Sequence, residues 1–110
     1  MLNWLMGKTT AELSVGELAQ RLDGPQAPLL LDVREPSEFA AGHVPGAVLM
    51  PLGQVAARMG ELPADREIAV ICRSGARSGR ATQLLTAQGL RAQNVAGGML
   101  AWRGPVQRGS

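Results

Sequence analysis

Two short apolar runs constrain what this chain can fold into more than any other feature: LLLDV at residues 29–33 and EIAVIC at residues 67–72. Their apolar residues follow one another instead of alternating with polar ones, which is typical of strands covered on both faces. Strands of that kind form parallel sheets with helices on either side. The two runs therefore predict an α/β fold built on a mainly parallel sheet.

Helix and strand signals alternate along the rest of the chain. Ser14 and Glu17 have the spacing of a capping box, so a helix is expected from there to about Gly24. Gly89 provides a left-handed stop for a helix that begins near residues 77–78. The other predicted elements are a helical turn over residues 35–43 closed by Gly42, a buried strand over residues 46–51, a helix over residues 53–62 with Val55, Ala56 and Met59 inward, and a short strand over residues 91–98.

A length of 110 residues fits a single domain and is too short for a substrate domain beside a cofactor domain. The core is expected over about residues 13–103, with a flexible tail over residues 104–110. The opening MLNWLMGK lacks a basic n-region, and no stretch approaches the roughly 20 apolar residues of a membrane span. We therefore expect a cytoplasmic protein with no membrane partner. The sequence leaves open whether Trp4, Leu5 and Met6 form an edge strand or cover the core.

Charge and composition exclude several classes of function. The net charge is only +2, the arginines are scattered, and aromatic residues make up 3% of the chain, so no nucleic-acid partner is expected. A single cysteine excludes an internal disulfide, and one cysteine with one histidine is too few for a zinc site. We expect neither a metal nor a cofactor, so any chemistry must come from the side chains.

The single cysteine, Cys72, ends the second apolar run and begins the stretch CRSGARSGR. A thiol is a weak nucleophile until it ionises, and its pKa falls near a helix N-terminus, near cations and where backbone N–H groups point at sulfur. Small residues here allow the amides to curl round the sulfur, and Gly75 permits a positive φ. Arg73 and Arg77 add positive charge suited to an anionic substrate. The stretch predicts a thiolate inside an anion cradle, at the carboxyl edge of the sheet where ligands bind.

The alternative is that Cys72 is inert packing, since free cysteine is among the most buried residue types. However, residues 72–79 also contain two arginines, two serines and two glycines, which a purely structural strand end does not need. Catalysis is therefore the favoured interpretation.

Three segments, in order and at family-like separations, resemble the rhodanese family of single-domain sulfurtransferases: LLLDVREPSEFAAGHVPGAVLMP, CRSGARS and NVAGGMLAW. The resemblance runs from about Leu13 to Trp102 and implies that Cys72 is the nucleophile that forms a persulfide. It implies that a six-residue active-site loop continues to Arg77, with Ser78 opening the helix behind it. The residues that it assigns to substrate binding are Arg73, Ser74, Gly75, Ala76, Arg77 and Ser78.

The chemistry implied by the resemblance has two steps. A sulfane sulfur passes from a small anionic donor such as thiosulfate to the cysteine, with release of sulfite. The sulfur then passes to cyanide or to a small or protein thiol. The implied partners are therefore a small anionic sulfur donor and a thiophilic acceptor.

Two alternative functions remain open. Cysteine phosphatases of the cell-cycle type and arsenate reductases have loops in which five residues separate the cysteine from an arginine, whereas four separate Cys72 from Arg77. The shorter loop favours a sulfur atom over a phosphoryl group. Rhodanese-like domains also serve as noncatalytic regulatory or binding modules, and the retention of Cys72 in an intact loop argues against that role.

Several other polar residues are interpreted as structural. Asp32 and Arg34 are expected to be paired, because a charge at a buried strand end costs free energy unless it has a partner. His43 is expected to be a hydrogen-bonded turn histidine rather than a general base. The resemblance implies that Asp32, Arg34, Glu35 and Glu38 form a buttress beside the active loop. The other structural assignments are Gly97 and Gly98 as a close-packed turn, Trp102 as an anchor, and Met50, Met59 and Met99 as core fillers.

Overall fold

The computed structural model describes residues 11–110 and contains, within that range, one sheet of five strands. The strands lie in the order β1-β5-β4-β2-β3, and each neighbouring pair is parallel. Their bounds are Glu12–Leu13 for β1, Leu29–Asp32 for β2, Val48–Leu49 for β3, Ile68–Ile71 for β4 and Ala92–Val95 for β5. The predicted α/β fold with a parallel sheet is confirmed.

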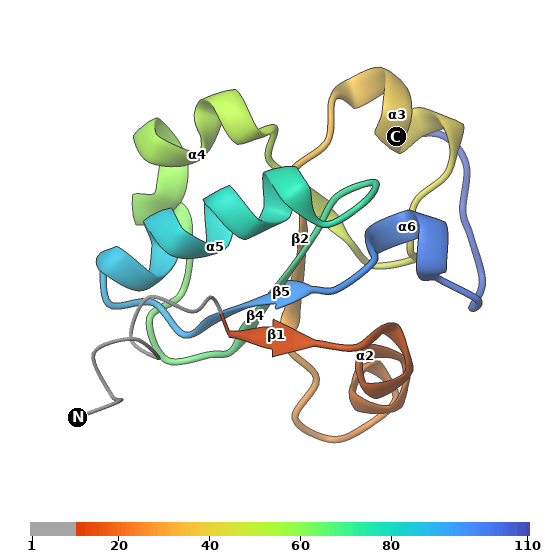
Figure 1. Cartoon of the computed structure of the whole chain (residues 1–110), viewed down its shortest axis with the longest axis horizontal. Coiled ribbons are helices and arrows are strands. Elements are labelled where there is room, and N and C mark those ends of the chain that lie inside the picture. Colours follow the sequence, from red (N-terminus) through yellow and green to blue (C-terminus); the bar gives the residue numbers. More distant parts are fainter. Residues whose placement is uncertain (1–10) are drawn as a thin grey trace.

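Helices cover both faces of this sheet (Figure 1). They are α2 (Val15–Leu22), α3 (Pro36–Ala41), α4 (Leu52–Arg58), the 3-10 turn η1 (Met59–Glu61), α5 (Ala76–Ala87) and α6 (Gly98–Ala101). Helices α4 and α5 cover one face, over an apolar core that includes Val70 and Leu85. Helices α2 and α6 cover the other face, over a core that includes Leu18 and Val95. Because both faces are covered, the central strand β4 is buried along its whole length.

Local sequence determines where two of the helices begin and end. At the start of α2, the Glu17 N–H donates to Ser14 Oγ at 3.0 Å, and the Ser14 N–H donates to Glu17 Oε1 at 3.0 Å. The predicted capping box is therefore confirmed. After α5, Gly89 has a φ of +85°, which confirms the predicted left-handed stop.

Two expectations about burial are wrong. The strand expected to be buried over residues 46–51 is the short edge strand β3, and Val48 in it is 44% exposed. Among the described strands, β3 lies at the end of the sheet beside β2, so its outer side has no covering strand. In α4, Val55 is buried but Ala56 is exposed, because the next residue along a helix points about 100° away.

Residues 104–110, which were expected to form a flexible tail, form backbone hydrogen bonds to the region of α3. His43 and Gln107 form an antiparallel bridge with N···O distances of 2.9 and 2.8 Å, and the Gly109 N–H donates to Ala40 O at 2.8 Å. Backbone pairing of this kind places few demands on side chains, so the composition of the tail does not reveal it. Trp4, Leu5 and Met6 lie outside the described residues. Within residues 11–110, no helix has both the length and the apolar character needed to cross a bilayer.

Candidate active site

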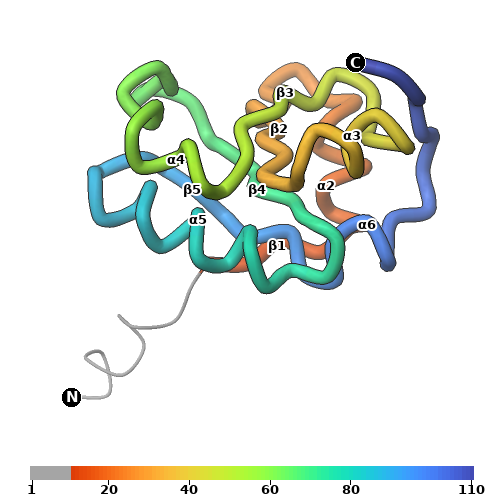
Figure 2. Tube along the Cα trace, turned by 90° about the horizontal axis from the view of Figure 1, so that it is seen from above, coloured from red at the N-terminus to blue at the C-terminus, as the bar shows by residue number. Residues whose placement is uncertain are grey.

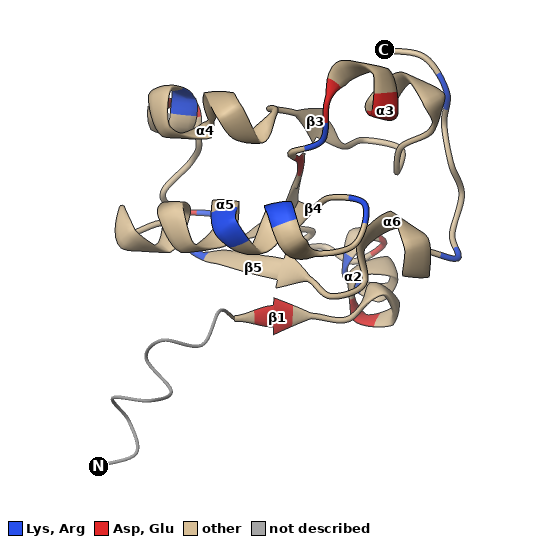
Figure 3. Cartoon of the chain, turned by 45° about the horizontal axis from the view of Figure 1, so that its top comes forward, with Lys and Arg blue, Asp and Glu red and all other residues tan. Residues whose placement is uncertain are grey.

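Cys72 follows β4 at the carboxyl edge of the sheet and begins the loop that leads into α5 (Figure 1). Seen from above in Figure 2, the same edge also gathers α3 and α6 beside this loop. Figure 3 shows basic residues in the β4–α5 loop and the first turns of α5, with acidic residues on α3. The β4–α5 loop and the helices α3 and α6, which are distant in the sequence, therefore lie together round one thiol. This is the edge of the sheet at which parallel α/β proteins bind ligands.

The loop curls round the sulfur of Cys72 and supplies hydrogen-bond donors to it. The Gly75 N–H lies 3.1 Å from Sγ, and the Ser78 Oγ lies 3.2 Å from it. Gly75 has a φ of +107°, a left-handed conformation that glycine adopts without steric cost, and it caps the N-terminus of α5. The sulfur therefore lies at the end of α5 where unpaired N–H groups favour negative charge.

Two opposing effects set the acidity of this thiol. Burial raises the pKa of Cys72, whose side chain is almost wholly inaccessible to solvent. Hydrogen bonds from Ser78, Gly75 and Ser74 act against burial and bring the pKa of the thiol below its ordinary value. The cradle predicted around the sulfur is therefore formed, and it favours the thiolate.

The two arginines of the loop have different environments. The Arg77 guanidinium donates to both carboxylate oxygens of Glu38 on α3, at 2.7 and 2.8 Å. This pair lowers the pKa of Glu38 to about 2 and raises the pKa of Arg77. Arg77 was expected to offer its charge to a substrate, whereas in the structure the charge is neutralised by Glu38. Arg73 is exposed at the start of the loop.

Asp32 and Arg34 form the buried ion pair that was expected at the end of β2. The Arg34 guanidinium donates to Asp32 Oδ2 at 2.8 Å, and it also donates to the carbonyl oxygens of Gly42 at 2.8 Å and Glu38 at 3.3 Å. Arg34 thus ties the end of β2 to the middle of α3 and to Gly42, which follows that helix. Glu38, which α3 holds in place, binds Arg77, so the predicted buttress beside the active loop is confirmed.

His43 and Trp102 also have the structural roles that were expected. The His43 ring stacks on Phe39 with a centroid distance of 3.6 Å, and its Nδ1 lies 2.7 Å from Phe39 O. Both contacts are with the preceding helix α3, as for a turn histidine. The Trp102 Nε1–H donates to Pro105 O at 2.9 Å, which anchors the chain after α6.

The turn at Gly97 and Gly98 fastens the active loop from the side of α6. The Met99 N–H donates to Cys72 O at 2.9 Å, and the Leu100 N–H donates to Arg73 O at 3.0 Å. A Cβ at Gly98 would lie 2.4 Å from Cys72 O, and the φ there is +55°. Only glycine allows this approach, so the predicted close-packed turn is confirmed.

Sequence reasoning missed Asn94, a buried residue of β5. Its Oδ1 lies 2.5 Å from Ser78 Oγ, and its Nδ2 donates to Gly75 O at 3.1 Å. Asn94 therefore contacts both residues that donate to the sulfur. The available signal was an amide in a predicted strand of a sheet with helices on both faces, because a buried amide must find a partner in the interior.

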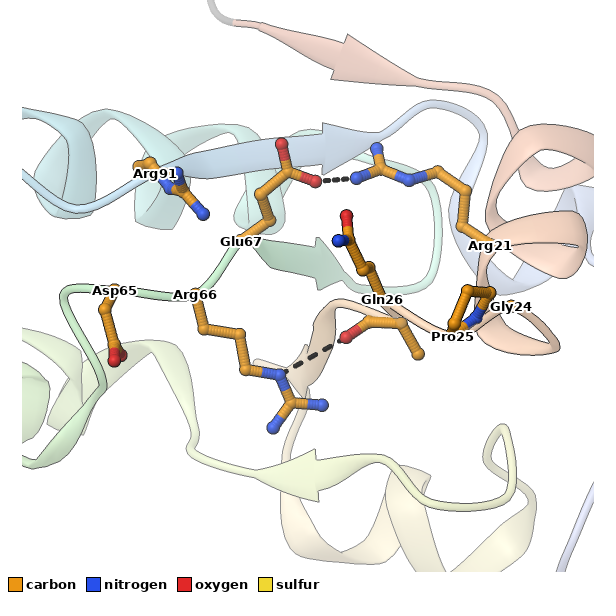
Figure 4. Close-up of a pocket in the computed structure, with 9 residues that line it drawn as sticks. Arg21, Gly24, Pro25, Gln26, Asp65, Arg66, Glu67 and Arg91 are labelled. Atoms are coloured by element: carbon orange, nitrogen blue, oxygen red, sulfur yellow. Dashed lines mark hydrogen bonds and ion pairs between the residues drawn. The ribbon is translucent and has the colours of Figure 1, made fainter.

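A second polar region lies at the opposite edge of the sheet (Figure 4). This hollow of about 750 Å³ lies beside the starts of β4 and β5 and is lined in part by Arg21, Arg66, Glu67 and Arg91. Arg21 forms an ion pair with Glu67, and the Arg66 Nε–H donates to Ala27 O at 3.3 Å. None of the lining side chains is a thiol, and the hollow lies at the opposite edge of the sheet from Cys72.

Residues 14–105 match the family of the Rhodanese-like domain. The chain belongs to the rhodanese-like family. A sulfurtransferase of Allochromatium vinosum is 42% identical to this rhodanese-like domain over 92 residues, which cover 83% of the domain's chain and 86% of the relative. Relatives of this kind support sulfur transfer as the general activity of the chain.

Solved structures have the same fold as this rhodanese-like domain. A rhodanese-like domain protein from Staphylococcus aureus matches with a TM-score of 0.85 and 29% identity, over 91% of this chain and 99% of its own. A thiosulfate sulfurtransferase from Pseudomonas aeruginosa matches with a TM-score of 0.84 and 26% identity, over 96% of this chain but 21% of its own. The rhodanese-like fold inferred from the sequence is therefore confirmed.

Proposed function

We propose that the protein is a sulfurtransferase of the thiosulfate type, in which Cys72 accepts a sulfane sulfur and carries it as a persulfide. The observation that carries this proposal is the hydrogen bonding of Sγ, which accepts from the Gly75 N–H at 3.1 Å and the Ser78 hydroxyl at 3.2 Å in a buried site. These donors stabilise the thiolate, which is the form that attacks sulfur. The thiosulfate sulfurtransferase of Pseudomonas aeruginosa supports the choice of donor class through its similarity in fold.

In the first step, the Cys72 thiolate attacks the outer sulfur of thiosulfate. A new S–S bond forms at Sγ, the S–S bond of thiosulfate breaks, and sulfite leaves with the bonding electron pair. The donor is a dianion, and the exposed Arg73 supplies positive charge at the entrance of the loop. The substrate contacts are assigned to Arg73, Ser74, Gly75, Ala76, Arg77 and Ser78.

In the second step, a thiophilic acceptor attacks the outer sulfur of the persulfide. With cyanide the product is thiocyanate, and with a small or protein thiol it is a new persulfide; in both cases the electron pair of the broken bond returns to Cys72 as thiolate. Cys72 is the only cysteine in the sequence, so no second thiol of this chain can convert the persulfide into an internal disulfide. The persulfide is therefore expected to be stable enough to isolate.

The loop supports a sulfur substrate over a phosphoryl or arsenate group. A tetrahedral phosphoryl or arsenate group bonded at Sγ needs more room than the single sulfur atom of a persulfide. Four residues between Cys72 and Arg77 make a short loop. A noncatalytic binding module is opposed by the thiol's lowered pKa, which a purely structural cysteine does not need.

We place this reaction in the cytoplasm. A thiol that must return to the thiolate after each transfer works best where thiols are kept reduced. No metal or cofactor takes part in either proposed step.

The proposal is tested by mixing the protein with thiosulfate and cyanide and measuring thiocyanate. The native chain is expected to form thiocyanate, and Cys72→Ser is expected to form none above the uncatalysed background. Arg91→Ala, at the opposite edge of the sheet, is the matched control and should retain native activity.

Two results would count against the proposal. Equal thiocyanate formation by the native chain and Cys72→Ser would exclude Cys72 as the residue that carries the sulfur. Loading of Cys72 by glutathione persulfide but not by thiosulfate would retain sulfur transfer and overturn the choice of donor.

A further inference from the structure

The side chain of Asn94 connects the two groups that donate to the active sulfur. Asn94 is 6% exposed in β5, and both of its side-chain hydrogen bonds go to residues of the cradle. Burying an amide costs free energy unless it forms hydrogen bonds, and the Asn94 amide forms its hydrogen bonds with Ser78 and Gly75. Gly75 O already accepts from the Gly79 N–H at 3.0 Å, so it does not depend on Asn94 for a partner.

The hydroxyl of Ser78 has two possible acceptors but a single proton. Its Oγ lies 2.5 Å from Asn94 Oδ1 and 3.2 Å from Cys72 Sγ. A serine hydroxyl donates one proton and accepts through its lone pairs. The proton of Ser78 can therefore point to the amide or to the sulfur, and the charge on the sulfur decides which arrangement is favoured.

We propose that Asn94 is a positioning residue that takes the Ser78 proton while the sulfur of Cys72 is uncharged and releases it when that sulfur is ionised. In the thiol form, the Cys72 S–H donates to Ser78 Oγ, and the Ser78 hydroxyl donates to Asn94 Oδ1. In the thiolate form, the hydroxyl rotates and donates to Sγ, and Oδ1 gives up this partner. The only proton lost in this change is the thiol proton, which leaves to solvent.

The same exchange fits the two states of the proposed reaction, and this part of the inference rests on the proposed function. Before sulfur is accepted, Sγ holds the negative charge and needs the Ser78 proton. In the persulfide, the charge lies on the outer sulfur and Sγ is bonded to it, so the Ser78 proton can return to Asn94. Asn94 thus favours the loaded state relative to the bare thiolate.

One consequence is that Asn94 opposes ionisation, whereas Ser78 promotes it. A thiolate with a very low pKa is a weaker nucleophile, and the best attacking thiol has a pKa near the ambient pH. The competition for one proton therefore limits how far the cradle lowers the pKa of Cys72.

The charged groups that surround Cys72 are not altered by substitution of Asn94. They are Arg73 and Arg77 of its own loop, the Asp32–Arg34 pair at the end of β2, and Glu38 of α3, which is bound to Arg77. Helix α6 has no ionisable side chain. Since asparagine is neutral, replacing it changes the hydrogen bonding of Ser78 without changing the local charge.

The experiment measures the pKa of Cys72 from the pH dependence of its alkylation rate by iodoacetamide in four proteins: native, Ser78→Ala, Asn94→Ala and the double variant. Ser78→Ala is expected to raise the pKa by about one unit, the scale of a hydrogen bond to a charged group. Asn94→Ala is expected to lower the pKa by about half a unit, because the Ser78 proton then has no competing acceptor. In the Ser78→Ala background, Asn94→Ala should leave the pKa unchanged, so that the two effects are not additive.

A purely structural role for Asn94 predicts a different pattern. The inference is overturned if Asn94→Ala shifts the pKa by the same amount with and without Ser78, or if it leaves the pKa of the native protein unchanged or raised. Asn94→Val introduces a β-branched residue, which strands favour, and must shift the pKa in the same direction, so the test does not depend on the folding of the alanine variant. Alkylation needs no sulfur donor, so this result is independent of whether thiosulfate loads Cys72.

Discussion

Both edges of the sheet hold arginines, but these arginines differ in burial and in their ion-pair partners. At the carboxyl edge, polar groups are buried and directed at one another: Arg34 is 6% exposed and donates to Asp32, while Ser78 and Asn94 meet beside the sulfur. At the amino edge, the hollow of about 750 Å³ has an Arg21–Glu67 pair whose side chains are 33% and 41% exposed. Solvent-exposed ion pairs contribute little to the free energy of unfolding, whereas removal of one partner of a buried pair lowers that free energy strongly.

The difference indicates what marks a chemical site in a small domain. The size of a hollow is a weak sign, because an open surface with solvated charges needs no special arrangement. Buried polar groups cost free energy and persist only where their partners are fixed. In this protein the buried polar groups with fixed partners are concentrated round Cys72.

The largest expected effect is on the buried pair at the carboxyl edge. Arg34→Met should destabilise the protein by about 4 kcal/mol, because Asp32 is left buried without its partner and the carbonyls of Gly42 and Glu38 lose a donor. The free energy of unfolding in urea measures this change. A loss no greater than that of Arg21→Met at the amino edge would remove the energetic distinction between the two edges.

A steric change at the same edge should be nearly as large. Gly98→Ala would place a Cβ 2.4 Å from Cys72 O at a positive φ, and we expect a loss of about 3 kcal/mol together with displacement of the active loop. Gly60→Ala is the matched control, because nothing lies within 4 Å of the added Cβ. Urea unfolding and thiocyanate formation should both be impaired in the first variant only; equal stability of the two variants would contradict the close approach of α6 to the loop.

The partly exposed Glu38–Arg77 pair, which joins α3 to the start of α5, should have a smaller effect. Glu38→Gln should cost about 1 kcal/mol at neutral pH, since the pair with Arg77 is bidentate but its side chains are 30% and 34% exposed. The pKa of Glu38 is lowered from 4.5 to about 2, so its contribution is present above pH 4.5 and is lost as the pH falls toward 2.

Unfolding of the native protein and Glu38→Gln across this pH range measures that dependence. The two free energies of unfolding should differ most above pH 5 and converge near pH 2. A difference that stays constant with pH would mean that the carboxylate of Glu38 contributes nothing through its charge.

The smallest effect is expected at the amino edge. Arg21→Met should change the free energy of unfolding by about 0.5 kcal/mol and leave thiocyanate formation at the native level, because its pair with Glu67 is solvated. Raising the salt concentration should reduce even this difference. A loss of transfer in this variant would connect the hollow to the chemistry and contradict the separation of the two edges.

The parts of the fold that could be predicted are those fixed by local sequence and by strand burial. Continuous apolar runs predicted the central strands β2 and β4, and Ser14 with Glu17 predicted the start of α2. Gly75 and the small residues after Cys72 predicted a loop that curls round the sulfur. These features depend on neighbours in the sequence, so a single sequence contains their signal.

The parts that could not be predicted depend on contacts between distant segments. Glu38 and Arg77 are 39 residues apart, so no local pattern indicated that Glu38 would take the charge of Arg77. Asn94 reaches Ser78 from a neighbouring strand, and the tail pairs with His43 through its backbone. Tertiary packing decides such contacts, and residue type alone does not.

The most direct test of the account is intact mass spectrometry of the protein after incubation with thiosulfate, followed by addition of cyanide. We predict that the native chain gains the mass of one sulfur, that Cys72→Ser gains none, and that cyanide removes the added mass while thiocyanate appears. A native chain that gains no mass although Cys72 is still alkylated at neutral pH would contradict the proposed sulfur carrier.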